Sequence, residues 1–220
     1  MAHIASALVF ELSKVAIPAI RERILGNLLN VDQELAARVA DGLAIKLPKA
    51  NPAAAPTLDM PPSDALSIVK AGDPPITGRK IAILFAEGSD GSAIEKLSKR
   101  IRKAGGTPFL VAPKVGGIAT TTGMLAADGQ LAGSPSVLFD AVALVLSAEG
   151  ATKLAMDSAA VGFVMDAYAH VKTIGANPEA SALLDRAGVE ADAGIVSLKE
   201  FLNVAPKRHW EREPKLRNLA

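Results

Sequence analysis

The sequence of 220 residues contains no cysteine. This absence excludes disulfides, thiolate zinc sites, iron–sulfur ligation and cysteine nucleophiles together. It also fits a cytoplasmic protein, because disulfide-stapled folds belong to oxidising compartments. Aromatic residues are scarce at 4%, and the single tryptophan, Trp210, stands between Arg208 and Arg212. One aromatic among mixed charges is more typical of an anchor onto a neighbouring surface than of a nucleic-acid site.

Neither sign of charge dominates, since 24 Lys and Arg residues face 23 Asp and Glu residues and the formal net charge is +1. This balance argues against an electrostatically driven nucleic-acid partner. No apolar run reaches the roughly 18 to 20 residues of a spanning helix, and the start lacks the features of a signal peptide. We therefore expect no membrane partner. Half of the residues are apolar, which argues for a globular chain.

Histidine is also rare, and His3, His170 and His209 lie far apart in the sequence. No pair of them has the spacing of metal ligands, so no metal site is predicted. Each histidine is interpreted as a surface or interface residue.

Residues 1–47 are expected to form short helices. Pro18 suits the first turn of a second helix. Asn30 and Gln33 resemble a capping box that opens a third helix, which Gly42 would close. Three short helices cannot enclose a core of their own, so they are interpreted as a helical segment of a larger body.

Residues 48–77 are interpreted as a proline-rich linker, in which prolines alternate with alanines and favour an extended backbone. Residues 78–220 alternate between buried apolar runs and amphipathic stretches. Such βαβ alternation predicts a mostly parallel sheet with helices on both faces. Asp128-Gly129 is expected to turn a small antiparallel excursion. A last helix from Ser197 to about Val204 would lead to a polar tail. The predicted strands cover residues 80–86, 108–112, 141–146 and 172–176.

The loops after these strands hold the candidate site, because chemistry in open parallel sheets sits at the carboxyl ends of the strands. The loop that starts at Glu87 lacks a phosphate-binding glycine pattern, so Ser89 or Asp90 is interpreted as a helix cap. Ser147 has no G-x-S-x-G elbow around it. The most informative position is Asn177, at a strand-to-helix junction where one large group of α/β proteins carries a nucleophile. The candidate pocket comprises Glu87, Ser147, Glu149 and Asn177.

The segment from Lys80 to Leu184 resembles the flavodoxin-like intracellular-protease (PfpI) family of the class I amidotransferase-like superfamily. The resemblance rests on Ile81-Ala-Ile-Leu-Phe85, Asp140-Ala-Val-Ala-Leu-Val-Leu146 and Ile174-Gly-Ala-Asn177. It implies a flavodoxin-like three-layer α/β domain, preceded here by short helices and a proline-rich linker. In that family the elbow residue is a cysteine supported by an acid. Asn177 stands at the cysteine position and Ala93 near the acid, so both departures remove the chemistry.

The flanking segments resemble the C-terminal region of large-subunit haem catalases, in which a linker follows the last helices of the catalytic core. The resemblance implies a parent enzyme that converts hydrogen peroxide to water and oxygen at a haem within a homotetramer. None of its catalytic residues can be carried over, so no cofactor is expected in this chain. The segments are Phe10-Glu-Leu-Ser-Lys-Val15, Ile20-Arg-Glu-Arg23, Asn30-Val-Asp32 and Pro206-Lys-Arg-His-Trp210.

The sequence thus leads to one main functional hypothesis, a stabilising or assembly module without catalase activity. A chaperone-like role is an alternative, since apolar helical residues that have lost a parent core could bind unfolded clients. Residual PfpI-type hydrolase or glyoxalase activity is disfavoured without a cysteine. A flavin site is a remote further alternative.

Overall fold

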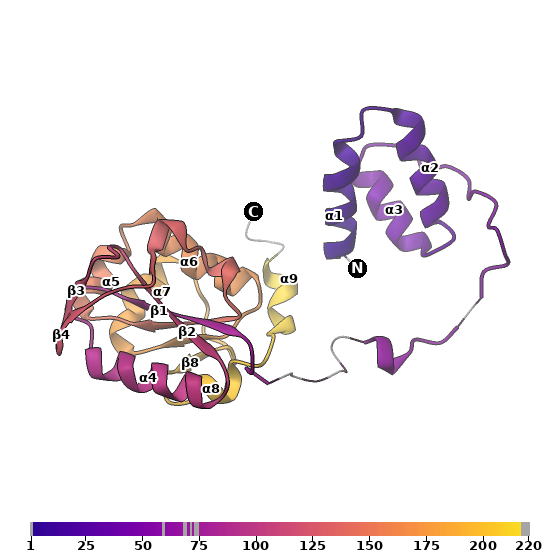
Figure 1. Ribbon diagram of the computed structural model, residues 1–220. Helices are drawn as coiled ribbons and strands as arrows, with labels where there is room; N and C mark the ends of the chain where they lie inside the picture. The colour runs from indigo at the N-terminus through magenta and orange to yellow at the C-terminus, as the bar shows by residue number, and fades with distance from the viewer. Residues whose placement is uncertain (1, 59, 68–69, 71, 73–74, 217–220) are drawn as a thin grey trace. The chain divides into compact units, whose positions relative to one another are not determined.

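The computed structural model describes residues 2–58, 60–67, 70, 72 and 75–216, without the side chain of Ala2. The chain divides into two compact units, residues 1–67 and 68–220 (Figure 1). The first unit has a small hydrophobic core of its own, so the expectation that three short helices cannot enclose one was wrong. The second unit has two larger clusters. Within the described ranges, no helix has the length and apolar character needed to cross a membrane.

The first unit contains α1 (Ala2–Ser13), α2 (Pro18–Leu28) and α3 (Gln33–Gly42). Its core gathers Leu12, Leu25 and Val39. Pro18 occupies the start of α2 as predicted, where its missing N–H leaves no intrahelical bond unmade.

The predicted ends of the third helix were wrong. Asp32, rather than Asn30, caps α3 by accepting a hydrogen bond from the Leu35 N–H at 2.8 Å. Gly42 is the last helical residue, and Ala44 takes the left-handed conformation beyond it. A Cβ on Gly42 would lie 2.6 Å from a methyl group of Val9. The glycine therefore permits close contact between α1 and α3 rather than terminating the helix.

Asn51 fastens the start of the predicted linker to α2. Its N–H donates to the Gly26 carbonyl at 3.0 Å, and its side-chain amide donates to the Arg23 carbonyl at 2.9 Å. Beyond it, the described linker residues form only one short 3-10 helix, η1 (Asp64–Leu66).

The second unit is built on a parallel sheet of six strands in the order β5-β2-β1-β6-β7-β8. Every described residue of β6 is buried, and so is all of β1 after Lys80, which explains their continuous apolar sequences. The strands are β1 (Lys80–Phe85), β2 (Thr107–Ala112), β5 (Gly129–Gln130), β6 (Ala141–Val145), β7 (Ile174–Ala176) and β8 (Ile195–Ser197).

Helices cover both faces of this sheet (Figure 1). α4 (Gly91–Lys103) and α8 (Phe201–Val204) pack on one face, against a cluster that includes Ile83 and Phe201. α5 (Ala148–Leu154), α6 (Ser158–Ala169) and α7 (Ser181–Arg186) pack on the other face. The flavodoxin-like three-layer α/β prediction is thereby confirmed.

Three expectations for this unit were wrong. The antiparallel hairpin consists of β3 (Ile118–Thr120) and β4 (Gly123–Leu125), which turn at Thr121-Thr122. Gly129 instead begins an edge strand beside β2. The helix expected to start at Ser197 starts at Phe201, because residues 195–197 extend the sheet as β8. The polar tail also folds onto the domain, as η5 (Trp210–Arg212) and α9 (Glu213–Leu216).

Candidate functional site

The side chain of Asn177 is fully engaged with the backbone of the neighbouring strand. Its Oδ1 accepts from the Leu146 N–H at 3.0 Å, and its Nδ2 donates to the Leu146 carbonyl at 2.6 Å. The same Nδ2 lies 2.6 Å from a carboxylate oxygen of Glu179. The amide thus continues the ladder between β6 and β7 beyond the last backbone pair, Leu144 and Ala176.

The backbone of Asn177 is also unlike a nucleophile elbow. Its φ of −83° and ψ of 160° are those of ordinary extended chain, followed by the 3-10 turn η4 (Pro178–Ala180). A nucleophile elbow places its residue on a sharp, strained turn that exposes the side chain above the sheet. Asn177 therefore joins two strands and presents no reactive group.

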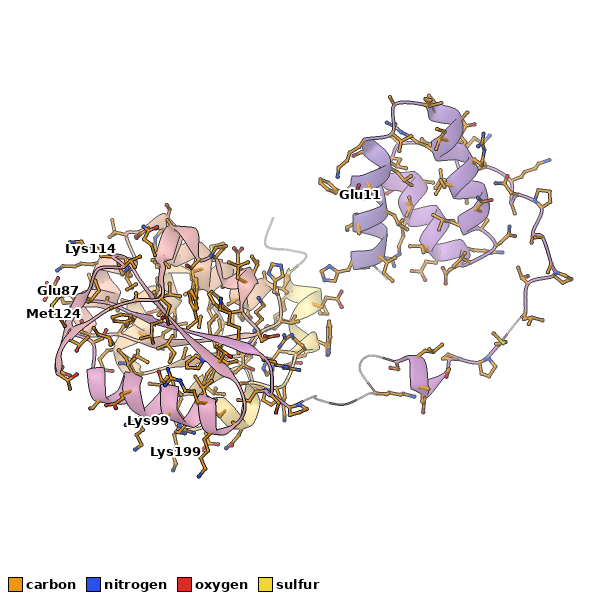
Figure 2. The ribbon with its side chains drawn as sticks, in the orientation of Figure 1. Glu11, Glu87, Lys99, Lys114, Met124 and Lys199 are labelled. Atoms are coloured by element: carbon orange, nitrogen blue, oxygen red, sulfur yellow. The ribbon has the colours of Figure 1, made fainter. Side chains whose placement is uncertain are left out.

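Ser147 and Glu87 meet at the carboxyl end of the sheet, but through a structural contact. The Ser147 hydroxyl donates to the Glu87 carbonyl at 2.6 Å and accepts from the Gly150 N–H at 3.0 Å, which caps α5. The Glu87 side chain is exposed at the surface of the second unit (Figure 2). Ser147 has no basic partner among its hydrogen bonds, so nothing here activates it as a nucleophile.

Glu149 points into solvent and pairs with Lys153 one turn later, at 2.7 Å. This hydrogen bond holds the pKa of the Glu149 carboxyl below its ordinary value. A general acid needs a raised pKa, so the environment of Glu149 opposes that role.

The remaining predicted positions lie at the start of α4. Asp90 is the N-cap and accepts from the N–H groups of Ser92 and Ala93 at 3.0 and 3.1 Å. A hydrogen bond from the Ser92 hydroxyl lowers the pKa of Asp90. Ser89 accepts from the Ala86 N–H, and Ala93 packs against the apolar cluster beneath α4. Asp90 rather than Ser89 is thus the cap, and Ala93 offers no proton.

A polar cluster that sequence reasoning missed lies at the opposite, amino end of the strands. Arg212 is 1% exposed and forms a two-point ion pair with Asp192, with Nε–Oδ2 and Nη2–Oδ1 distances of 2.6 and 2.8 Å. Its Nη1 donates to the Lys172 carbonyl at 2.6 Å. The guanidinium carbon lies 4.4 Å from the centre of the Tyr168 ring. The charged tail sequence was the available signal, but sequence alone does not show that Asp192 faces it.

His209 was predicted to be a surface or interface residue, but it belongs to the same cluster and is buried inside the second unit. Its Nε2 lies 3.0 Å from the Thr173 hydroxyl, which itself donates to the Val204 carbonyl. The imidazole therefore donates from Nε2. Burial, followed by the positive charge of Arg212, lowers the pKa of His209. Both effects favour a neutral ring.

Asp192 is the anionic partner of Arg212, Glu211 lies 3.3 Å from Nδ1 of His209, and Lys172 contributes its carbonyl to the cluster. Burial opposes ionisation of Asp192, but hydrogen bonds from Arg212 and from the Gly194 N–H keep its pKa below the ordinary value. Lys172 is buried and donates to the Ser136 carbonyl at 2.8 Å. Burial lowers the pKa of Lys172 to about 8. The cluster holds residues 209–212 against the segments that lead into β7 and β8.

No haem ligand emerges from this arrangement. Tyr168 lies beneath Arg212, and burial raises the pKa of its phenol, which disfavours the anionic oxygen a metal would need. Among the described residues, no group of three His, Cys, Asp or Glu side chains is placed to hold a metal ion. Tyr168 is thus placed as a packing residue beneath Arg212 and not as a haem ligand.

Two stretches of the chain match known protein families. Residues 77–207 match the C-terminal domain found in long catalases, and residues 2–43 match a family described as catalase-related immune-responsive. The first match covers more than half of the chain.

Proteins with similar sequences include several catalases. Catalase C of Rhizobium meliloti is 43% identical over 98% of this chain and 32% of its own length. Catalase HPII of Pseudomonas aeruginosa is 36% identical over 96% of this chain and 31% of its own length. Catalase-B of Dictyostelium discoideum is 29% identical over 99% of this chain and 33% of its own length. This chain spans about a third of the length of these relatives and belongs to the family of C-terminal domains found in long catalases.

Proposed function

We propose that this chain is a stabilising and assembly module of a large-subunit catalase, without peroxide turnover of its own. The observation that carries the proposal is the bonding of Asn177, whose amide pairs with both backbone groups of Leu146 where the superfamily would place a nucleophile. The polar groups of Ser147 are likewise used in holding loops together. A domain in which Asn177 and Ser147, the two candidate residues nearest a nucleophile's role, both bond to its own backbone is suited to a structural role.

In this proposal the parent protein disproportionates hydrogen peroxide at a haem in its remaining part, as a homotetramer in the cytoplasm. The first unit supports a docking role, because several large apolar side chains are exposed on it. Phe10, which is 62% exposed, borders a hollow between α1 and α3 together with Val9 and Gly42. Exposed apolar surface of this kind is stable in water only if few residues contribute or a partner covers it. On the helices and their connections the exposed set is Ile4, Phe10, Ile17 and Val31, and beyond the helices of this unit it continues with Leu47, Leu58, Met60 and Leu66.

Two measurements test the proposal. Haem titration and oxygen release on the purified chain should show neither binding nor turnover, and turnover comparable with a complete catalase would overturn the idea. Deleting this region from the parent subunit should lower the temperature of thermal inactivation and the tetramer fraction. In the intact parent, Phe10→Ser should reproduce part of that loss. The matched control is Glu11→Gln, which removes only the exposed ion pair with Lys14.

The exposed apolar side chains of the first unit also support a second candidate, chaperone-like binding of unfolded proteins. Light scattering from a heated client protein distinguishes the two roles. If this chain suppresses aggregation of the client at an equimolar ratio, and Phe10→Ser weakens that suppression, the result would favour the chaperone role. No suppression would count against it. Residual PfpI-type hydrolase or glyoxalase activity has only the fold in its favour. Any such activity that survives Asn177→Ala unchanged does not come from this junction.

A further inference from the structure

Every methionine whose side chain the structure describes is exposed to solvent. The exposed fractions are 71% for Met60, 72% for Met124, 86% for Met156 and 50% for Met165. Methionine is normally among the residues most often buried in protein cores. The three hydrophobic clusters of the described chain contain leucine, isoleucine, valine, alanine and aromatic residues but no sulfur. Because the sequence has no cysteine, all described sulfur lies at the surface.

These methionines come from separate parts of the chain. Met60 lies in the linker, and Met124 lies on the hairpin strand β4, at the surface of the second unit (Figure 2). Met156 follows α5, and Met165 lies on α6. A single docking patch would need these side chains on one element or on adjacent faces. Their distribution indicates that the thioethers are kept out of the cores individually.

A surface thioether and a buried one respond differently to a peroxide. The sulfur attacks one oxygen of hydrogen peroxide, the O–O bond breaks, and an S–O bond forms. The other oxygen leaves as water with both protons, so the sulfur loses two electrons and the peroxide gains them. The product is a polar sulfoxide. In a core this group would be buried without hydrogen-bond partners, whereas at the surface water solvates it.

We propose that Met60, Met124, Met156 and Met165 are oxidation sites for hydrogen peroxide, and that their oxidation leaves both units folded. The inference rests on the proposed function only for the source of the peroxide, because a catalase module works in a peroxide-rich solution. The rest of the inference depends on the exposure of the four methionines and on the absence of sulfur from the described hydrophobic clusters. Such a chain would keep stabilising its parent after its accessible sulfur had been oxidised.

The test uses the purified 220-residue chain, hydrogen peroxide and peptide mass spectrometry. We expect each of the four methionines to gain one oxygen at a rate within an order of magnitude of methionine in an unstructured peptide. Met165 should react most slowly, because it is the least exposed of the four. The thermal unfolding midpoint should stay unchanged after complete oxidation. Resistance of the four residues, or loss of cooperative unfolding on oxidation, would overturn the proposal.

A matched control places a methionine inside the sheet. Leu144 is completely buried, and Leu144→Met conserves volume, so the fold should tolerate it. This new thioether should oxidise about tenfold or more slowly than Met156, since only local or global opening exposes it. When both chains are oxidised in urea, the Leu144→Met variant should fail to refold on removal of the urea, whereas the chain without this substitution should refold. If Leu144→Met fails to fold, Leu97→Met on α4 serves the same purpose. The proposed assembly role is tested separately, on the tetramer of the parent catalase. A failure of that role would therefore not change the result expected from the oxidation test.

Discussion

Arg212 and Asp192 join the end of the chain to the segment before β8 through two parallel hydrogen bonds of 2.6 and 2.8 Å. Such fork-shaped pairing combines charge with fixed geometry. Because Arg212 is almost fully buried, neither water nor salt can replace its partner. The pair therefore fixes the position of the tail, and it also holds His209 next to Thr173.

Removing one member of this pair should strongly destabilise the second unit. Arg212→Ala leaves the Asp192 carboxylate without its main partner, and breaking a buried pair typically costs about 3 to 5 kcal/mol. Thermal or urea unfolding of the second unit measures the change. Lys215→Ala is the control, because it removes a fully exposed pair with Glu190 and should leave the midpoint unchanged. Equal effects of the two substitutions would contradict the structural role of Arg212.

Acid should weaken the attachment of the tail through His209. Burial and the charge of Arg212 lower the pKa of His209 in the folded chain, so the unfolded chain binds this proton more readily. The stability contributed by the neutral ring is complete above the unfolded pKa of about 6.5 and is lost as the pH falls through the folded pKa.

Urea midpoints measured from about pH 7.5 down to about pH 5 should reveal this loss, in the range where histidine titrates. His209→Gln should remove part of the slope. His170→Gln should retain it, because that side chain is exposed. The Asp192 carboxyl, whose pKa is also lowered, adds a further loss at more acidic pH. A slope that both variants share with the parent sequence would exclude His209 as its origin.

Two glycines in the second unit should respond in opposite directions to a methyl group. A Cβ on Gly194 would lie 2.1 Å from Nη2 of Arg212 and 2.3 Å from Cδ2 of His209, so Gly194→Ala must displace the tail. Overpacking of this kind typically costs about 1 to 3 kcal/mol. Nothing lies within 4 Å of a Cβ on Gly162, in the middle of α6, so Gly162→Ala should stabilise by about 0.5 to 1 kcal/mol. The unfolding midpoints of the two variants should fall on opposite sides of the midpoint of the unsubstituted chain.

The sequence predicted the central strands well because their apolar residues are continuous and local. β1 and β6 lie where the apolar runs lie, and α4 between them follows its amphipathic pattern. β8 was missed because Ile195–Ser197 is short and becomes a strand only by pairing with β7. Its pairing is a tertiary effect that propensity does not contain.

The candidate site shows the same limit. Sequence reasoning identified Asn177, Ser147 and Glu87 as neighbours at the carboxyl ends of the strands. It could not show that the polar groups of Asn177 and Ser147 bond to the backbone of adjacent loops. The buried tail cluster was missed because a charged sequence such as Arg208-His-Trp-Glu-Arg212 ordinarily indicates a solvated surface. Partners distant in the sequence, namely Asp192, the Lys172 carbonyl and the Tyr168 ring, make Arg212 a core residue.

Loss of the Asn177 amide should destabilise the junction of β6 and β7. Asn177→Ala leaves both the N–H and the carbonyl of Leu146 without partners, and each unmet group costs about 1 to 3 kcal/mol. Asn177→Asp retains an acceptor for the N–H but places a carboxylate beside that of Glu179. Glu179→Gln is the matched control, since it preserves the pairing with Leu146. Unfolding midpoints should fall for both Asn177 variants and remain near the parent value for Glu179→Gln.

Restoring a thiol at the junction should not restore an enzyme. Asn177→Cys places the nucleophilic atom on an extended backbone at φ −83° and ψ 160°, rather than on a strained elbow, and Ala93 supplies no acid. The charged side chain that contacts Asn177 is the carboxylate of Glu179, and a negative neighbour does not lower a thiol pKa from its ordinary value of about 8.5, so alkylation by iodoacetamide should rise with pH like that of a simple thiol. The rate of hydrolysis of an activated ester should stay at that of the unsubstituted 220-residue chain. The double variant Asn177→Cys/Ala93→Glu supplies both missing groups and should remain equally inactive, because the turn still holds the sulfur beside the Leu146 backbone. Turnover by either variant above that of the parent chain would show that residue chemistry alone, and not the geometry of the turn, separates this domain from the hydrolases it resembles.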